Sequence, residues 1–180
     1  MIVRRMKILL LLSLMGGAAA NIASGSQAAD LTLHDLSGKR VRLQDYRSQI
    51  VVLNFWATWC SPCAQEIPIL VDAEMQYQKR GVVFIGASLD DKKTRSRIPE
   101  FVSRYRIGFP IWLGATGDDL AAISMGTLMP ATVFIDRGGQ VVARIQGELR
   151  PGELKERIDW LLGDRTTPPP RTLIQHLGGN

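Results

Sequence analysis

The sequence predicts an α/β fold in which a mixed central sheet is flanked by helices. Two observations lead to this class. Short apolar runs, typical of buried strands, alternate with segments of helical period in the order β-α-β, α-β, α, β-hairpin and α, with right-handed crossovers expected. The chain also has 180 residues, 46% of them hydrophobic and 22% charged, which suffices for one well-packed domain but not for two.

The first 28 residues have the layout of a secretory signal peptide. Three basic residues precede an apolar stretch, Ile8–Met15, and small residues follow it up to Ala20. We expect cleavage after Ala20 or Ala28; the alternative is an uncleaved N-terminal anchor extending through Ile22, although about 20 apolar residues normally span a bilayer. Either way the body is expected in the periplasm or another extracytoplasmic compartment, where disulfides persist. The basic residues are Arg4, Arg5 and Lys7.

Charge and cysteine content exclude several classes of function. The net charge is +5, but the N-terminal segment carries three of these charges, and the remaining balance of +2 argues against a nucleic-acid binder. Two cysteines cannot form a multi-disulfide scaffold. Because His34 and His176 are the only histidines, a four-ligand zinc site would need carboxylates, and no metal or other cofactor is expected. The two thiols are therefore expected to act as a pair.

The first elements of the body are expected to be a hairpin and a buried strand. Residues 31–33 and 40–43 flank the turn residues Ser37 and Gly38, which predicts a small N-terminal hairpin. Residues 50–56 are apolar except for Asn54, as in a strand buried on both faces.

Later segments continue the alternation of helices and strands. From Pro62 the apolar residues take helical spacing, which predicts a helix that ends at Gly81. After Gly163, three consecutive prolines and a Gly-Gly-Asn end predict an extended, mostly disordered tail over 164–180, so that the domain occupies 29–163. The apolar helix face comprises Ile67, Leu70, Val71 and Met75. The remaining expected elements are strands 82–87 and 109–113, helices 98–105, 121–125 and 153–162, and a hairpin of 132–135 with 141–145.

The chemistry is expected at the Cys-x-x-Cys motif of residues 60–63. A buried strand precedes this motif and a helix follows it, so both thiols lie within disulfide reach across one helical turn. The first sulfur then lies at the helix N-terminus, where unpaired N–H groups and the helix dipole stabilise a thiolate. We therefore assign Cys60 as the nucleophile and Cys63 as the resolving thiol. Pro62 fits the first turn, where a missing N–H costs little.

Two stretches of sequence resemble the thioredoxin superfamily. They are NFWATWCSPC at residues 54–63, followed by EIP at 66–68, and MPATVFIDRGG at 129–139. The resemblance covers residues 31–162 and is to the exported, membrane-linked branch typified by TlpA and ResA. It implies a thioredoxin-like mixed sheet with a central αβ insertion over 89–113, and thiol–disulfide oxidoreductase activity through a redox-active disulfide.

The resemblance also implies roles for residues around the cysteine pair. Glu66 lies one helical turn after Cys63, where a buried carboxyl would exchange a proton with that thiol and replace the aspartate that thioredoxin carries at the position of Asn54. The alternative is an exposed acid in the first turn of the helix. Pro130 resembles the cis-proline that faces the cysteines and leaves the preceding backbone free to bind an extended partner. The expected substrate-contacting residues are Trp59, Pro62, Met129 and Pro130.

Four hypotheses of function are weighed against the sequence. The first is an exported reductant that is fed by a membrane-embedded thiol donor and acts on client protein disulfides, for cytochrome c maturation or copper-site assembly. The second is an exported oxidant or isomerase with the same chemistry, and the third is a binding domain with a structural disulfide. A peroxidase of the peroxiredoxin type is disfavoured, because the Pro-x-x-x-Thr-x-x-Cys lead-in is absent. No nucleic-acid partner is expected, and membrane contact is expected only if the N-terminal segment is retained.

Overall fold

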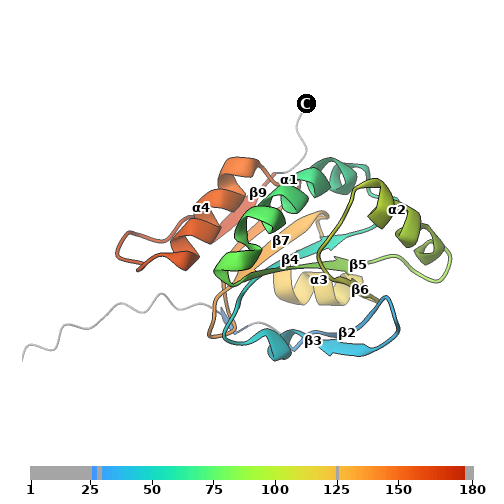
Figure 1. Ribbon diagram of the computed structural model, residues 1–180, viewed down its shortest axis with the longest axis horizontal. Helices are drawn as coiled ribbons and strands as arrows, with labels where there is room; N and C mark the ends of the chain where they lie inside the picture. The colour runs from blue at the N-terminus through green and yellow to red at the C-terminus, as the bar shows by residue number, and fades with distance from the viewer. Residues whose placement is uncertain (1–25, 28–29, 125, 177–180) are drawn as a thin grey trace, which may run out of the picture.

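The computed structural model describes residues 26–27, 30–124 and 126–176 of the chain (Figure 1). Within these residues the strands form one nine-stranded sheet in the order β1-β8-β7-β4-β5-β6-β2-β3, with β9 also paired to β8. The predicted export segment lies outside the described residues except for Ser26–Gln27, which form β1.

The sheet and its helices confirm the predicted α/β class. The helices are α1 (Ser61–Tyr77), α2 (Ile98–Arg104), α3 (Gly117–Ser124) and α4 (Pro151–Leu162). None of the helices in the described part of the chain is long and apolar enough to cross a bilayer. The strands are β1 (Ser26–Gln27), β2 (Thr32–Asp35), β3 (Arg40–Arg42), β4 (Ile50–Trp56), β5 (Val82–Ser88), β6 (Ile111–Leu113), β7 (Ala131–Ile135), β8 (Gln140–Gln146) and β9 (Leu173–Gln175).

Strand β4 lies at the centre of the sheet and separates two apolar cores. It runs parallel to β5 and antiparallel to β7, and all seven of its residues are buried. Because successive side chains of a strand point to opposite faces, Val52 and Trp56 enter the core under α1 and α4, whereas Leu53 enters the core with α3 and the N-terminal hairpin (Figure 1). The continuous apolar run in the sequence is thus explained by helices on both faces.

Helix α1 spans most of the predicted range, but its buried face differs from the prediction. It begins directly after Cys60, and a turn of 3₁₀ helix then leads to Gly81, whose φ of +79° ends the element. Met75 was predicted on the apolar face but is 59% exposed. The buried face of α1 includes Glu66 and Tyr77, whose polar groups form hydrogen bonds with other parts of the fold. Because the prediction counted only apolar residues, it placed the buried face of the helix incorrectly.

Helix α3 begins four residues earlier than the predicted start at residue 121. The Thr116 hydroxyl accepts a hydrogen bond from the Asp119 N–H at 3.1 Å, and the Asp119 carboxylate accepts one from the Thr116 N–H at 2.9 Å. This reciprocal pair is an N-terminal capping box. The Thr-x-x-Asp signal was present in the sequence, but the predicted start of the helix rests on the short apolar run that follows it.

The sequence predicted a disordered tail after Gly163, and this is wrong for residues 164–176. The segment folds back along α4 and adds β9 in parallel to β8 (Figure 1). The Trp160 indole donates to the Thr167 carbonyl at 3.1 Å, and the buried Arg157 guanidinium donates to the Arg171 carbonyl at 2.9 Å. Three prolines exclude regular structure where they stand, but the residues after them find unpaired backbone groups on the edge of β8.

Candidate active site

The two cysteines lie where β4 gives way to α1, and they are joined in a disulfide. Their Cα atoms are 5.3 Å apart. Cys60 is the N-cap residue of α1, and its sulfur accepts a hydrogen bond from the Cys63 N–H at 3.2 Å. Pro62 lies in the first turn, as predicted. The structure therefore puts the Cys60 sulfur at the N-terminus of α1, where it accepts the Cys63 N–H and where a thiolate is stabilised.

The two sulfurs differ in their exposure to solvent. Cys60 is 7% exposed, whereas Cys63 is fully buried. Trp59 is 55% exposed directly beside this pair. An incoming disulfide can thus reach Cys60 more easily than Cys63, and Trp59 offers it an apolar surface.

The Met129–Pro130 segment lies at the same end of the sheet. The peptide bond between these residues is cis, as the resemblance implied. Ala131 pairs with Phe55, so Pro130 lies beside the end of β4 that leads into the cysteine motif. Met129 is half-buried and packs against the apolar cluster that contains both cysteines. The structure therefore brings all the predicted substrate-contacting residues to one end of β4.

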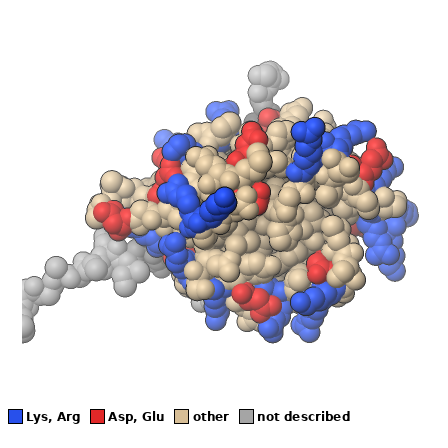
Figure 2. All heavy atoms as spheres, in the orientation of Figure 1, with Lys and Arg blue, Asp and Glu red and all other residues tan. Residues whose placement is uncertain are grey.

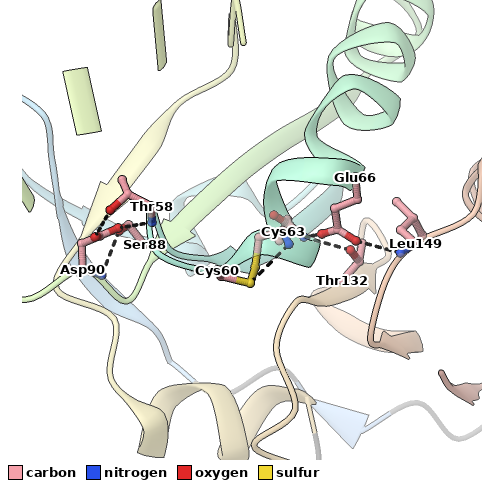
Figure 3. The surroundings of a disulfide bond; sticks show 9 residues. Thr58, Cys60, Cys63, Glu66, Ser88, Asp90, Thr132 and Leu149 are labelled. Carbon is pink, nitrogen blue, oxygen red and sulfur yellow. Dashed lines mark hydrogen bonds between the residues drawn. A yellow bond between two sulfur atoms is a disulfide. The ribbon is translucent and has the colours of Figure 1, made fainter. Parts of the chain in front are cut away.

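Glu66 is fully buried one turn after Cys63 (Figure 3). Its Oε1 accepts a hydrogen bond from Asn54 Nδ2 at 2.6 Å, and its Oε2 accepts one from the Leu149 N–H at 2.8 Å. Loss of hydration raises the pKa of this carboxyl to about 7, and the two hydrogen bonds oppose that rise. The exposed alternative is thus excluded, and the carboxyl titrates close to neutral pH.

Asn54 is the side-chain hydrogen-bond partner of this carboxyl inside the fold. Its Nδ2 donates to both Glu66 and Thr132 Oγ1, while its Oδ1 has no hydrogen-bond partner among the described residues. If the amide turns over, Oδ1 faces Glu66 and accepts a hydrogen bond from the protonated carboxyl, and the Thr132 hydroxyl can donate to the same oxygen. This turn would put Nδ2 where Oδ1 now has no partner, so the protonated carboxyl would gain an acceptor at the cost of a buried, unpaired donor.

Asp90 lies on the opposite side of the disulfide from Glu66 (Figure 3) and was missed by the sequence analysis. It follows β5, and its carboxylate accepts hydrogen bonds from the backbone and side chain of Thr58. Because β4 and β5 are parallel, with Trp56 opposite Ser88, the segments after both strands meet at one edge of the sheet. An acidic residue two positions after the second buried strand was the signal that could have revealed it.

The described residues contain no group of three or more His, Cys, Asp or Glu side chains that could hold a metal ion. His34 is exposed on β2, and the His176 ring lies 3.0 Å from the Glu153 carboxylate. The reactive groups that the structure gathers are two sulfurs and a titratable carboxyl, which suit proton-coupled thiol–disulfide exchange.

Known proteins similar to this chain carry out the same chemistry. The AhpC/TSA family model matches residues 24–144. The thiol-disulfide oxidoreductase ResA of Geobacillus thermodenitrificans is 35% identical over 167 residues, which cover 88% of this chain and 94% of that protein. The protein of the same name from Bacillus subtilis is 29% identical over 147 residues, or 82% of this chain and 80% of that one.

The fold has a similar counterpart among solved structures. A candidate thiol:disulfide interchange protein DsbE from Chlorobium tepidum superposes with a TM-score of 0.68 at 29% identity, covering 77% of this chain and 97% of that one. Fold, cysteine pair and relatives agree. The chain belongs to the AhpC/TSA family and is a ResA-like thiol–disulfide oxidoreductase.

Proposed function

We propose that this protein is an exported reductant that takes electrons from a membrane-embedded thiol donor and reduces the disulfides of specific client proteins. The observation that carries the proposal is a redox-active cysteine pair at the start of α1 in a chain whose first residues have the layout of a secretory signal. Oxidising pathways already supply disulfides outside the cytoplasm, so a second general oxidant would be redundant there. We place its clients in cytochrome c maturation or copper-site assembly.

The reaction transfers two electrons in two exchange steps. The Cys60 thiolate attacks one sulfur of the client disulfide, which forms a mixed disulfide and releases the other client sulfur as a thiolate. Cys63 then loses its proton and attacks the Cys60 sulfur. This step releases the second client thiol and forms the Cys60–Cys63 disulfide. The client disulfide is reduced to two thiols, and the membrane donor returns the cysteine pair to its reduced form.

Glu66 supplies the proton acceptor for the second step. Cys63 is shielded from solvent, so its proton needs an acceptor inside the protein, and Glu66 follows it by one helical turn. A carboxyl with a pKa of about 7 accepts this proton and returns it when the donor reduces the disulfide.

Covalent trapping tests the direction and the clients. In Cys63→Ser, Cys60 can still attack but nothing resolves the mixed disulfide, so a client remains attached. We expect one or a few exported proteins to be captured and to be released by dithiothreitol. The matched control is the variant in which both cysteines are changed to Ser, which should capture nothing. The parental protein should be largely reduced in cells.

Two outcomes would overturn the proposal. A broad range of unfolded secreted proteins in the trap, together with an oxidised cysteine pair in cells, would make the protein an oxidant or isomerase. A disulfide that resists mild reduction in an alkylation titration would make it a structural bond and the protein a binding domain.

A further inference from the structure

Asp90 is a buried carboxylate that has no part in the proton transfer assigned to Glu66. It is 6% exposed and follows β5 at the edge of the sheet where the cysteine motif begins. Its Oδ2 accepts hydrogen bonds from the Thr58 N–H at 2.8 Å and from the Ser88 hydroxyl at 2.9 Å, and its Oδ1 accepts one from the Thr58 hydroxyl at 2.6 Å (Figure 3). Its own N–H donates to Ser88 Oγ at 3.0 Å.

The charge of Asp90 is stabilised by neutral donors. Within the described part of the chain, no Lys, Arg or His side chain forms an ion pair with it. A buried carboxylate is costly unless its oxygens accept hydrogen bonds, and two of the three donors come from Thr58. Asp90 and Thr58 thus hold each other through both the backbone and the side chain of Thr58.

Thr58 is a central residue of the turn that joins β4 to α1. The Cys60 N–H donates to the Ala57 carbonyl at 3.1 Å and closes this turn, which has Thr58 and Trp59 at its centre. At the start of the turn, the Leu89 N–H donates to the Trp56 carbonyl at 2.8 Å. The segment after β5 therefore fixes the turn at its start and at its centre.

We propose that Asp90 is a positioning residue for thiol–disulfide exchange, and that it acts through Thr58 to hold the Cys60 sulfur at the N-terminus of α1. The sulfur accepts the Cys63 N–H only while the turn keeps Cys60 in the N-cap position. In the reduced protein the same N–H group and the helix dipole stabilise the Cys60 thiolate. If the turn loosens, the sulfur loses this donor. The proposal rests on the thiol–disulfide exchange of the family and is independent of the direction of electron flow.

The two possible roles of Asp90, holding the turn and acting through its charge, predict opposite changes in Cys60 reactivity when Asp90 is replaced by a neutral residue. A negative charge close to Cys60 disfavours its thiolate, so removal of the charge alone would make Cys60 more reactive. Loss of the hydrogen bonds to Thr58 would make Cys60 less reactive. Asp90→Asn removes the charge but keeps an oxygen that can accept the Thr58 N–H, and the Thr58 hydroxyl can turn to accept from the new amide.

The experiment measures the alkylation of Cys60 by iodoacetamide against pH. The Cys63→Ser background is used so that only Cys60 reports. We expect Asp90→Ala to raise the pH at which Cys60 reacts by about one unit, which slows labelling about tenfold below that pH. Asp90→Asn should restore the rate to within about threefold of the parental rate, and Thr58→Val, which keeps only its N–H bond to Asp90, should be intermediate.

The matched control is Asp91→Ala. Asp91 is exposed, and its carboxylate accepts hydrogen bonds from the Lys93 and Thr94 N–H groups of its own loop, so this variant should label at the parental rate. A folded Asp90→Ala variant with the parental pH profile would overturn the proposal, as would faster labelling in both Asp90 variants. If Asp90→Ala does not fold by circular dichroism, Thr58→Val decides, and a parental profile there refutes the proposal. Alkylation needs neither client nor donor, so these results stand whether or not the reductant proposal holds.

Discussion

At the level of single residues, the cysteine pair depends on polar groups buried on either side of it. Glu66 has two hydrogen-bond donors, the Asn54 side-chain amide and the Leu149 N–H. On the other side, Asp90 accepts only from neutral groups. One carboxyl is therefore suited to exchange a proton near neutral pH, whereas the other is suited to hold a turn.

Glu66→Gln is expected to keep the fold and to slow thiol exchange. Glutamine has the volume of glutamate but cannot take the Cys63 proton, so exchange at pH 7 should fall by about 100-fold, the lower range for general acid–base catalysis. The measurement is the rate of disulfide exchange with a small disulfide over pH 5–9. If the variant matches the parental rate at every pH, the proton travels through water instead.

Cys60 is expected to react before Cys63 in the reduced protein. It is the more exposed of the two and accepts the N–H at the start of α1, so its thiolate is both reachable and stabilised. Iodoacetamide should label it first, at a pH below the value of about 8.5 for a free cysteine. Peptide mass analysis after brief labelling distinguishes the two thiols. Equal labelling of both would contradict the assignment of Cys60 as the nucleophile.

At the level of elements, the C-terminal segment completes the edge of the sheet. The Arg144 N–H donates to the Thr172 carbonyl and the His176 N–H to the Gln146 carbonyl, each at 2.8 Å. Gly147, at the end of β8, has a φ of +87° and donates its N–H to the Pro130 carbonyl at 2.8 Å. The tail therefore packs against Gly147, which contacts the cis-proline and lies two residues before Leu149, the N–H donor of Glu66.

Removal of residues 164–180 is expected to destabilise the protein. The deletion leaves Arg144, Gln146 and the buried Arg157 without their partners in the tail, which should lower the free energy of unfolding by about 2–4 kcal/mol. The midpoint of urea unfolding measures this loss. Deletion of residues 177–180 alone is the control and should leave the midpoint in place. An unchanged midpoint after the longer deletion would show that β9 does not stabilise the fold.

Gly147→Ala tests the same contact from the other side. A Cβ at this position would clash with the His176 carbonyl oxygen, and the positive φ adds a further cost. In the chain that ends at Gly163 only the cost of φ remains, so the substitution should be less damaging there than in the full chain. Equal losses of unfolding free energy in both backgrounds would show that the close approach to the tail is not the cause.

At the level of the whole molecule, one sheet supports two cores under a mixed charged surface. Figure 2 shows basic and acidic side chains interspersed around the rim of one face, with an uncharged centre. The cysteine pair and Glu66 belong to the face under α1 and α4. The same burial that shields Cys63 therefore raises the pKa of Glu66 and links the chemistry to stability.

Stability is expected to fall as the pH rises from 4 to 8. The folded-state pKa of Glu66, about 7, lies above the ordinary value of 4.5. As the pH rises, Glu66 therefore ionises in the unfolded chain before it ionises in the fold, and this favours the unfolded state. The destabilisation that comes from Glu66 is absent below pH 4 and reaches about 3 kcal/mol near pH 8. Glu66→Gln should lack this part of the pH dependence, measured by urea unfolding of the oxidised protein. Identical pH profiles for both proteins would contradict the elevated pKa.

Local patterns predicted the central elements and the redox motif, but contacts between distant segments were not predictable in this way. The strands at 50–56 and 82–87 and the helix after Cys60 follow from periodicity within each segment. The Thr58–Asp90 contact depends on the parallel register of β4 and β5, which no single segment encodes. The pairing of β9 likewise depends on where the tail meets the edge of β8.

If the proposed export segment is cleaved, strand β1 makes the position of the cut structurally important. Ser26 and Gln27 pair with Val141 and Gln140, next to the stretch of β8 that β9 covers. Cleavage after Ala20 would leave β1 in place, whereas cleavage after Ala28 would remove it. In the second case the N-terminal half of β8 becomes a free edge, to which an extended peptide or a second copy of the chain can add a strand. If the export segment is cleaved, the position of the cut thus decides whether this edge is closed by the protein itself or open to association.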